Sequence, residues 1–275
     1  MPSSSLKLKE DFERRIYSEN FPKQLETLMA NIKDQESIET LNKLLQRLKC
    51  WIHSNFLERN EVCNSSDFAE YIKIKKTLRK IKNEKKVPFK ELLGEVFHYH
   101  NGLYFLPEKI KKRLSNSIFI DCGASRGDSA YVFCQYAPKS VLCFEADTNL
   151  YNELIAVIKH CQLKVAIPIN LFVSNVISDV LRSTTIDNYL EGNADVIGLI
   201  KMDIEGGEHD AIQGAKLTIL KEKPILLISI YHNARDFFEI KSEIEKIRSD
   251  YCFLIRQLAP LPFNYPLSET YLIAY

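Results

Sequence analysis

The sequence predicts an α/β protein: a doubly wound sheet of seven strands, the last one antiparallel, with an N-terminal helical extension. Two observations support the sheet. From about residue 117 onward, short apolar runs alternate with amphipathic segments, which is typical of a mostly parallel sheet covered by helices on both faces. The last two apolar runs, 251–257 and 270–275, are joined by a proline-marked loop that is too short for a crossover helix, so they are expected to pair as a hairpin.

The helical extension is predicted for residues 1–95, which contain one glycine, Gly94. Apolar residues recur there at three- and four-residue spacing, as they do on one face of an α-helix. The apolar seam over 38–52 covers barely two heptads, so packing onto the neighbouring domain is favoured over a coiled coil. A homodimer formed through these helices stays open as a second interpretation.

Residues 96–275 are predicted to form the second domain, which contains the sheet. Each expected strand is a short apolar run bounded by polar, glycine or proline residues. The run 196–202 is almost entirely apolar, as expected for a central parallel strand that is buried on both faces. The expected strands cover residues 117–120, 140–144, 165–169, 196–202, 225–230, 251–257 and 270–275.

The composition is that of an ordinary globular protein, with 275 residues, of which 45% are hydrophobic and 27% charged. The net charge of +1 conceals an asymmetry: residues 1–115 carry 23 basic and 16 acidic side chains, a balance of +7, and the remainder carry 14 and 20, a balance of −6. The basic run 73–86 lacks the interleaved aromatic residues that stack on nucleic-acid bases. We interpret it as the solvated face of a helix and expect no nucleic-acid partner.

The cysteines and the N-terminus predict a cytoplasmic protein. The seven cysteines are odd in number, form no C-x-x-C motif and fall partly inside apolar strands, so they are interpreted as buried thiols in a reducing compartment. Residues 1–10 lack the apolar core of a signal peptide. The longest apolar runs, about ten residues, are too short to span a bilayer, so no transmembrane segment is expected.

A glycine-containing turn follows the first expected strand. It reads Asp-Cys-Gly-Ala-Ser-Arg-Gly-Asp from Asp121 to Asp128, and Glu145 ends the second strand 24 residues after Asp121 (145 − 121). Glycines allow the backbone to approach a ligand, and an acid at the end of the second strand can accept hydrogen bonds from a ribose. The spacing is close to the roughly 20 residues of a nucleotide-binding βαβ unit, so the turn predicts a nucleoside pocket.

The turn has the form D-x-G-x-x-x-G rather than the G-x-G-x-x-G of dinucleotide enzymes. An acid in the turn suits a cofactor that carries a cation and no pyrophosphate, and S-adenosylmethionine is the expected cofactor. Asp121 is expected to face the methionyl ammonium or its bound water, and Glu145 the ribose hydroxyls. For Asp128, a cofactor contact and a plain N-cap of the next helix are equally supported. The expected cofactor-binding set is Asp121, Gly123, Ala124, Ser125, Asp128, Glu145 and Ala146.

Three further polar residues are expected at the same rim of the sheet, where open α/β sheets bind ligands. Asp203 ends the fourth strand and Glu205 follows it in a glycine turn, so both are candidates for orienting or deprotonating an acceptor hydroxyl. His232 ends the fifth strand and is a candidate general base, since its unperturbed pKa is near 6.5. The acids alone specify no complete cation cage, so no metal is predicted. Glu208 is expected to have a structural role at a helix N-terminus.

Several blocks of the sequence resemble the FkbM-type S-adenosylmethionine-dependent methyltransferases. The most specific is Lys-Met-Asp-Ile-Glu-Gly, which ends at Gly206, and the resemblance covers about residues 97–275. It implies a class I methyltransferase fold and O-methylation, usually of a sugar or another polyhydroxylated metabolite. The other matching blocks are 118–130, 143–147, 184–190 and 226–232.

The predicted function is therefore an S-adenosylmethionine-dependent O-methyltransferase with a small-molecule or glycan acceptor. One departure from the family supports an alternative: only nine residues separate Ser174 from Thr184, where such enzymes usually carry a longer stretch with a hairpin. The alternative is a methyltransferase-like protein that binds the cofactor, is catalytically impaired and acts through its helical region. A nicotinamide dehydrogenase is disfavoured by the form of the glycine turn and by the C-terminal hairpin.

Overall fold

The computed structural model describes residues 4–53, 63–84, 87–260 and 265–275. The expectations for the first three residues of the N-terminal segment, and for Lys85 and Lys86 of the basic run, lie outside the described residues. Within the described ranges, every helix is too short or too polar to cross a bilayer.

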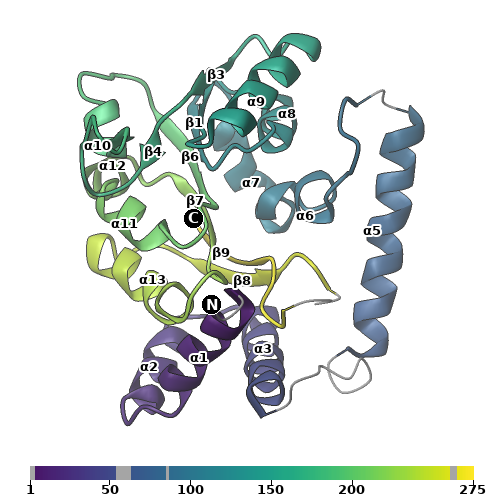
Figure 1. Cartoon of the computed structure of the whole chain (residues 1–275), viewed down its shortest axis with the longest axis vertical. Helices are drawn as coiled ribbons and strands as arrows, with labels where there is room; N and C mark the ends of the chain where they lie inside the picture. Colours follow the sequence, from purple (N-terminus) through teal and green to yellow (C-terminus); the bar gives the residue numbers. More distant parts are fainter. Residues whose placement is uncertain (1–3, 54–62, 85–86, 261–264) are drawn as a thin grey trace.

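A seven-stranded sheet forms the centre of the fold, with the strand order β3-β2-β1-β6-β7-β9-β8 (Figure 1). β9 runs antiparallel to both β7 and β8, and the other pairs are parallel. The predicted α/β fold, with its doubly wound sheet and antiparallel last strand, is therefore confirmed. The strands are β1 (Ile118–Cys122), β2 (Ser140–Phe144), β3 (Ala166–Ile169), β6 (Ile197–Met202), β7 (Ile225–Ser229), β8 (Phe253–Gln257) and β9 (Thr270–Ala274), and a separate pair is formed by β4 (Phe172–Val173) and β5 (Ser183–Thr184).

Helices precede the sheet and alternate with its strands. The helices before the sheet are α1 (Ser4–Ile16), α2 (Phe21–Met29), α3 (Gln35–His53), α5 (Ser65–Glu84), α6 (Gly94–Phe97), η1 (His100–Phe105), α7 (Glu108–Lys111) and η2 (Lys112–Leu114). Those within the sheet region are α8 (Asp128–Phe133), η3 (Cys134–Tyr136), α9 (Thr148–His160), α10 (Ile186–Tyr189), α11 (Glu208–Gln213), α12 (Lys216–Glu222) and α13 (Ala234–Ile247).

The two faces of the sheet have different partners because side chains alternate along each strand. Ile118 and Ile120 of β1 join a core that also contains buried residues of α11, α12 and α13. Phe119, between them, belongs to a second core with residues of η1, α8 and α9. The sheet is thus packed on both faces, and the polar residues that follow its strands lie at its rim.

The N-terminal helices pack on the same chain. α1 and α2 lie against α13, and α3 lies along the edge strand β8 (Figure 1). Asp11 Oδ2 accepts a hydrogen bond from the backbone N–H of Ala234 (2.8 Å), and Ser37 Oγ accepts one from the backbone N–H of Ile255 (2.9 Å). This agrees with the expected packing of the extension onto the sheet-containing region, whereas the domain boundary at residue 95 and the homodimer stay predictions.

α5 lies beside the rest of the molecule, against α6 (Figure 1). Its Ile74 is buried, while Lys75, Lys76 and Arg79 are exposed. The described part of the basic run therefore forms a solvated helical face, as the sequence suggested.

Candidate functional site

A cavity of about 340 Å³ lies at the carboxyl ends of β1, β2 and β6. Its volume lies at the lower end of the range of small-molecule sites. It brings together residues from the expected cofactor-binding and catalytic sets. The lining residues are Gly123, Ser125, Phe144, Glu145, Ala146, Asp147, Leu150, Leu171, Phe172, Val173, Asp203, Ile204 and Glu205.

Glu145 connects the glycine turn to the end of β2. One carboxylate oxygen accepts a hydrogen bond from the backbone N–H of Ser125 (2.8 Å), and the other accepts one from the backbone N–H of Asp147 (2.8 Å). A carboxylate has about four acceptor positions, so these two bonds leave capacity for a ligand in the cavity. Contact between Glu145 and a ribose stays a prediction, and the position of Glu145 in the cavity lining permits it.

Gly123 is where the glycine turn touches the end of β6. Its φ is +78°, and a Cβ atom at this position would lie 1.9 Å from the carbonyl oxygen of Asp203. Only glycine tolerates both the left-handed backbone and this approach. The glycine turn consequently packs directly against the backbone at the end of β6.

Asp121 lies inside β1 rather than after it, because the strand extends to Cys122. Its side chain is fully buried, is absent from the cavity lining, and forms an ion pair with Lys201 (Oδ1–Nζ 3.2 Å). Burial raises the pKa of Asp121, and the charge of Lys201 opposes that rise. The predicted contact with a methionyl ammonium stays a prediction, and the geometry favours an indirect role.

Sequence reasoning did not identify Lys201. It is the register partner of Asp121 across the β1–β6 pair, and its Nζ also donates a hydrogen bond to the Gly123 carbonyl oxygen (2.8 Å). Burial opposes its charge, but Asp121 and the nearby Asp203 and Asp128 raise its pKa above the ordinary value, so Lys201 stays protonated. The sequence feature that could have indicated the Lys201–Asp121 ion pair is a lysine in an otherwise apolar central strand.

The structure corrects the N-cap interpretation of Asp128 by one residue. Gly127, with φ +86°, occupies the N-cap position, and Asp128 is the first residue of α8. The carboxylate of Asp128 accepts a hydrogen bond from the backbone N–H of Ser129 (2.9 Å), and burial raises its pKa.

Ala124 is completely buried, and its backbone N–H donates to the Phe144 carbonyl oxygen (2.9 Å). Cofactor contacts by Asp128 and Ala124 therefore stay predictions for residues outside the cavity lining.

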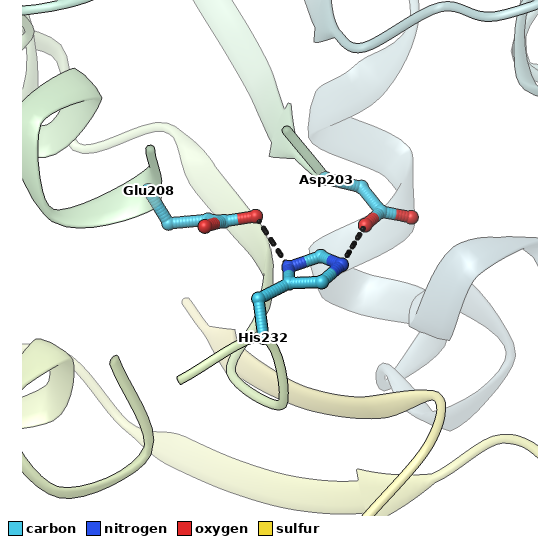
Figure 2. A group of neighbouring side chains, drawn as sticks. All are labelled: Asp203, Glu208 and His232. Atoms are coloured by element: carbon cyan, nitrogen blue, oxygen red, sulfur yellow. Dashed lines mark hydrogen bonds and ion pairs between the residues drawn. The ribbon is translucent and has the colours of Figure 1, made fainter. Parts of the chain in front are cut away.

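His232 lies between carboxylates, as Figure 2 shows. Its Nδ1 is 2.9 Å from Glu208 Oε1, and its Nε2 is 3.6 Å from Asp203 Oδ1. Nε2 is also 3.6 Å from Glu205 Oε2. The structure thus brings the three expected catalytic residues together and adds Glu208 behind them.

Glu208 begins α11, at a helix N-terminus as expected, and its side chain has a second role. Its side chain is completely buried, and Oε1 accepts hydrogen bonds from the backbone N–H of Ile204 (2.8 Å) and from Ser229 Oγ (2.9 Å), besides its contact with His232. A buried carboxylate held in this way fixes the orientation of the imidazole, as the third member of a catalytic triad does.

The acidic surroundings change the protonation of His232. Burial alone would lower its pKa, but the hydrogen bond and charge of Glu208, with the charges of Asp203 and Glu205, raise it to about 9. The ring is therefore an imidazolium at neutral pH. A general-base role requires the pKa to fall when a cation occupies the adjacent cavity.

Asp203, Glu208 and His232 could in principle hold a metal, because one potential ligand atom from each lies within 4.8 Å of the others. The imidazole, however, separates the two carboxylates: Nδ1 faces Glu208 and Nε2 faces Asp203 (Figure 2). An ion bound to one ring nitrogen would be next to only one of those acids. The arrangement therefore fits a chain of hydrogen bonds better than a three-ligand metal centre.

The segment just before the short link forms part of the cavity wall. β4 pairs in parallel with β5, and Phe172 and Val173 of β4 line the cavity. The link between these strands exposes Val180 and Leu181. The apolar wall on this side is thus built by β4 and not by the nine-residue link, and the predicted openness of the adenine side stays a prediction.

The sheet order, the antiparallel last strand and the cavity at the carboxyl ends of the strands define a class I methyltransferase-like protein. Residues 170–253 match the family model of the Methyltransferase FkbM domain. This match covers less than a third of the chain, and it confirms the predicted resemblance to FkbM-type methyltransferases for that segment. The matched segment includes Asp203, Glu208 and His232, whereas the turn 121–128 precedes it.

Solved structures support the same fold. The crystal structure of methyltransferase FkbM from Methylobacillus flagellatus KT has a TM-score of 0.68 and 23% sequence identity, and the similarity covers 96% of this chain and 61% of that one. The chain thus spans about three fifths of the length of that protein.

Two weaker similarities carry no functional argument. One is to an rRNA methylase from Streptococcus thermophilus, with 11% identity, coverage of 68% of this chain and 96% of that one, and a TM-score of 0.44. The other is to a putative methyltransferase from Streptococcus mutans in complex with SAH, with 13% identity, coverage of 60% and 92%, and a TM-score of 0.43. No curated protein matches the chain.

Proposed function

We propose that the chain is an S-adenosylmethionine-dependent O-methyltransferase that acts on a hydroxyl of a sugar or another polyhydroxylated metabolite. One observation carries this proposal: a single cavity is lined both by Glu145 with the glycine turn and by Asp203 with Glu205. Asp203 is also 3.6 Å from His232. Cofactor-binding and proton-accepting groups are therefore adjacent.

The residues of the cavity suit the cofactor. Glu145 offers acceptors for the ribose hydroxyls, and Leu150, Leu171 and Phe172 offer apolar surface for a nucleobase. The acids at the rim favour a ligand that carries positive charge. When bound, the cofactor supplies an electrophilic methyl group on a sulfonium.

The remaining chemistry is positioning and the removal of one proton. We assign the orientation of the acceptor hydroxyl to Asp203, whose Oδ2 accepts a hydrogen bond from Tyr271 (2.8 Å) and is thereby fixed. His232 accepts the hydroxyl proton at Nε2 after the positive charge in the cavity has lowered its pKa. Glu208 holds the ring through Nδ1, and the exposed Glu205 contributes charge at the mouth of the site.

Calorimetry and a methyl-transfer assay test this function together. Titration with S-adenosylmethionine, S-adenosylhomocysteine and NAD should give binding of the first two alone. Labelled-methyl transfer to a panel of sugars and polyols, followed by mass spectrometry, should then place the label on an oxygen. Binding of NAD in preference to the sulfonium cofactor would overturn the proposal.

The alternative is a cofactor-binding protein with little or no turnover, and the nine-residue link favours it. A short link covers less of the ligand, and each Å² of apolar surface left unburied forfeits roughly 25 cal/mol. We accordingly propose a dissociation constant in the tens of micromolar or weaker, about −6 kcal/mol. Nanomolar binding with ordinary turnover would eliminate this alternative.

A cytoplasmic location belongs to the proposal as well. Cys122 and Cys143 are buried in the central strands, and burial raises the pKa of the Cys143 thiol. Such thiols are typical of proteins in a reducing compartment. Fractionation of cells that express the full-length protein would test the location.

A further inference from the structure

We propose that Asp236 carries a proton and acts as a positioning residue, completing a buried chain of side chains in the order Asp203, His232, Glu208, Asp236. The inference rests on the proposed function, which makes His232 the proton acceptor. It assigns a role to a residue at the beginning of α13 that neither the glycine turn nor the rim of the sheet includes.

Two buried oxygen atoms lead to this inference. Glu208 is 0% exposed and Asp236 is 1% exposed. Glu208 Oε2 and Asp236 Oδ1 nevertheless have no hydrogen-bond donor among the described residues. The two carboxyl groups are themselves within hydrogen-bonding contact of each other. Ionised carboxylates only accept hydrogen bonds, so one of the pair must hold a proton to join them.

The other contacts of the pair show which residue holds that proton. Glu208 Oε1 accepts from Ile204 N–H, Ser229 Oγ and His232 Nδ1, and hydrogen bonds of this kind stabilise the charged form. Asp236 has one side-chain donor, Asn233 Nδ2, at 2.5 Å from Oδ2. Burial, followed by the negative charge of Glu208, raises the pKa of Asp236 to about 8. Asp236 is therefore the neutral partner at pH 7.

This assignment completes the hydrogen bonding of Glu208. The Asp236 hydroxyl donates to Glu208 Oε2, so Glu208 keeps Oε1 directed at His232 Nδ1 (2.9 Å). The Nδ1–H tautomer is then fixed, and Nε2 faces Asp203 (Figure 2), a residue that lines the cavity. Loss of the proton from Asp236 would place two buried carboxylates against each other and release Glu208 from this orientation.

Other charged groups near Asp236 are already engaged elsewhere. On α1, Asp11 accepts from the Ala234 N–H. On α11 and α13, His209 contacts Arg235 at 3.3 Å, and in the loop after β6 the exposed Glu205 faces His232 Nε2. Glu239 of α13 pairs with Arg15 of α1 (2.7 Å) and with Arg235 of its own helix (3.8 Å). Titration in this neighbourhood therefore acts on the Asp236–Glu208–His232 contacts.

Infrared difference spectroscopy on the full-length chain tests the proton directly. The wild-type spectrum minus that of Asp236→Asn should contain one protonated-carboxyl band that disappears as the pH rises through about 8. The asparagine amide can donate to Glu208 in place of the acid, so this variant should fold. Asp210→Asn, at a half-exposed position of α11, is the matched control and should give no such band. A wild-type spectrum without the Asp236 band would overturn the assignment.

Kinetics test the positioning role. Asp236→Asn should keep turnover near pH 7 and lose the decline above about pH 8, whereas Asp236→Leu should lower turnover about 10–10²-fold with an unchanged KM for the cofactor. Equal losses in both variants would refute the hydrogen-bond role. The infrared result needs no methyl transfer: the band without any turnover would reject the proposed function alone, and turnover without the band would reject this inference alone.

Discussion

Lys201 and Asp121 face each other as register partners in the two central strands, and their charged atoms are 3.2 Å apart with both side chains buried. Lys201 also donates to the Gly123 carbonyl oxygen, so one buried ion pair fixes the conformation of the glycine turn. Asp121 thus shapes the cavity through Lys201 rather than from its wall.

Removing one partner of this pair should be strongly destabilising. Lys201→Met leaves Asp121 buried without its counterion, which typically costs about 3–5 kcal/mol of unfolding free energy. Urea denaturation followed by circular dichroism measures the loss. The double variant Lys201→Met with Asp121→Leu should recover most of it; a double variant as unstable as the single one would show that the charge pair is not the cause.

Glu145→Ala should weaken S-adenosylmethionine binding by roughly 1.5–3 kcal/mol, the scale of hydrogen bonds to a charged group. The variant also removes the acceptor of the Ser125 and Asp147 N–H groups, so its melting temperature must be measured alongside. Glu153→Ala, which removes an exposed acid paired with Arg126, is the control. Wild-type calorimetric affinity in a folded Glu145→Ala protein would rule out the ribose assignment.

Asp203→Asn and His232→Ala should each lower turnover about 10²–10⁴-fold while leaving cofactor affinity nearly unchanged. His160→Ala, at the exposed end of α9, should have no effect. If turnover survives in both variants, the base lies elsewhere, and Glu205 is the next candidate.

The pKa of His232 predicts how turnover depends on pH. In the free enzyme the ring loses its proton at about pH 9, so kcat/KM should rise from pH 6 until the loss of the Asp236 proton near pH 8 opposes the rise. In the cofactor complex the added positive charge should move the rise in kcat to lower pH. A flat profile in both parameters would contradict a base role for His232 and point to Asp203.

Stability should fall as the pH rises from about 5 to 9. The folded-state pKa of His232 is raised to about 9, and burial raises those of Glu269 to about 8 and Glu95 to about 7, so at neutral pH the folded chain binds more protons than the unfolded chain. The stabilisation from His232 is complete below its unfolded pKa near 6.5 and is lost as the pH rises through about 9.

Thermal melts across this pH range measure the effect, of which the His232 part should amount to about 3 kcal/mol, at about 1.4 kcal/mol for each unit of pKa difference. Glu269→Gln should reduce the slope, because the amide does not titrate. A melting temperature that rises between pH 6 and pH 9 would show that the folded chain does not retain these protons.

The sequence predicted the strands well because their apolar periodicity depends on local burial. The expected 196–202 and 225–230 became β6 and β7 with shifts of about a residue. Local pattern could not show that β1 extends through Asp121, because strand length is set by pairing with its neighbours. The sequence contains Lys201, but its pairing with Asp121 follows only from the register of β1 and β6.

The sequence predicted which residues form the candidate site better than it predicted the contacts between them. Asp203, Glu205 and His232 meet as the strand ends suggested. Glu208 resembled a helix N-terminal acid, and nothing local distinguishes such an acid from one that turns inward to a histidine 24 residues later. The raised pKa of His232 likewise depends on charges that only the fold assembles.

The packing at Gly123, where an added Cβ would lie 1.9 Å from the Asp203 carbonyl oxygen, has a thermodynamic consequence. Because the backbone of the cofactor turn rests on the carbonyl of Asp203, neither segment can shift without displacing the other. Any adjustment that the acceptor causes at Asp203 must alter the free energy of cofactor binding, and by reciprocity the cofactor must alter acceptor affinity by the same factor. The two ligands should therefore bind as a coupled pair, with each dissociation constant a function of the other ligand's concentration.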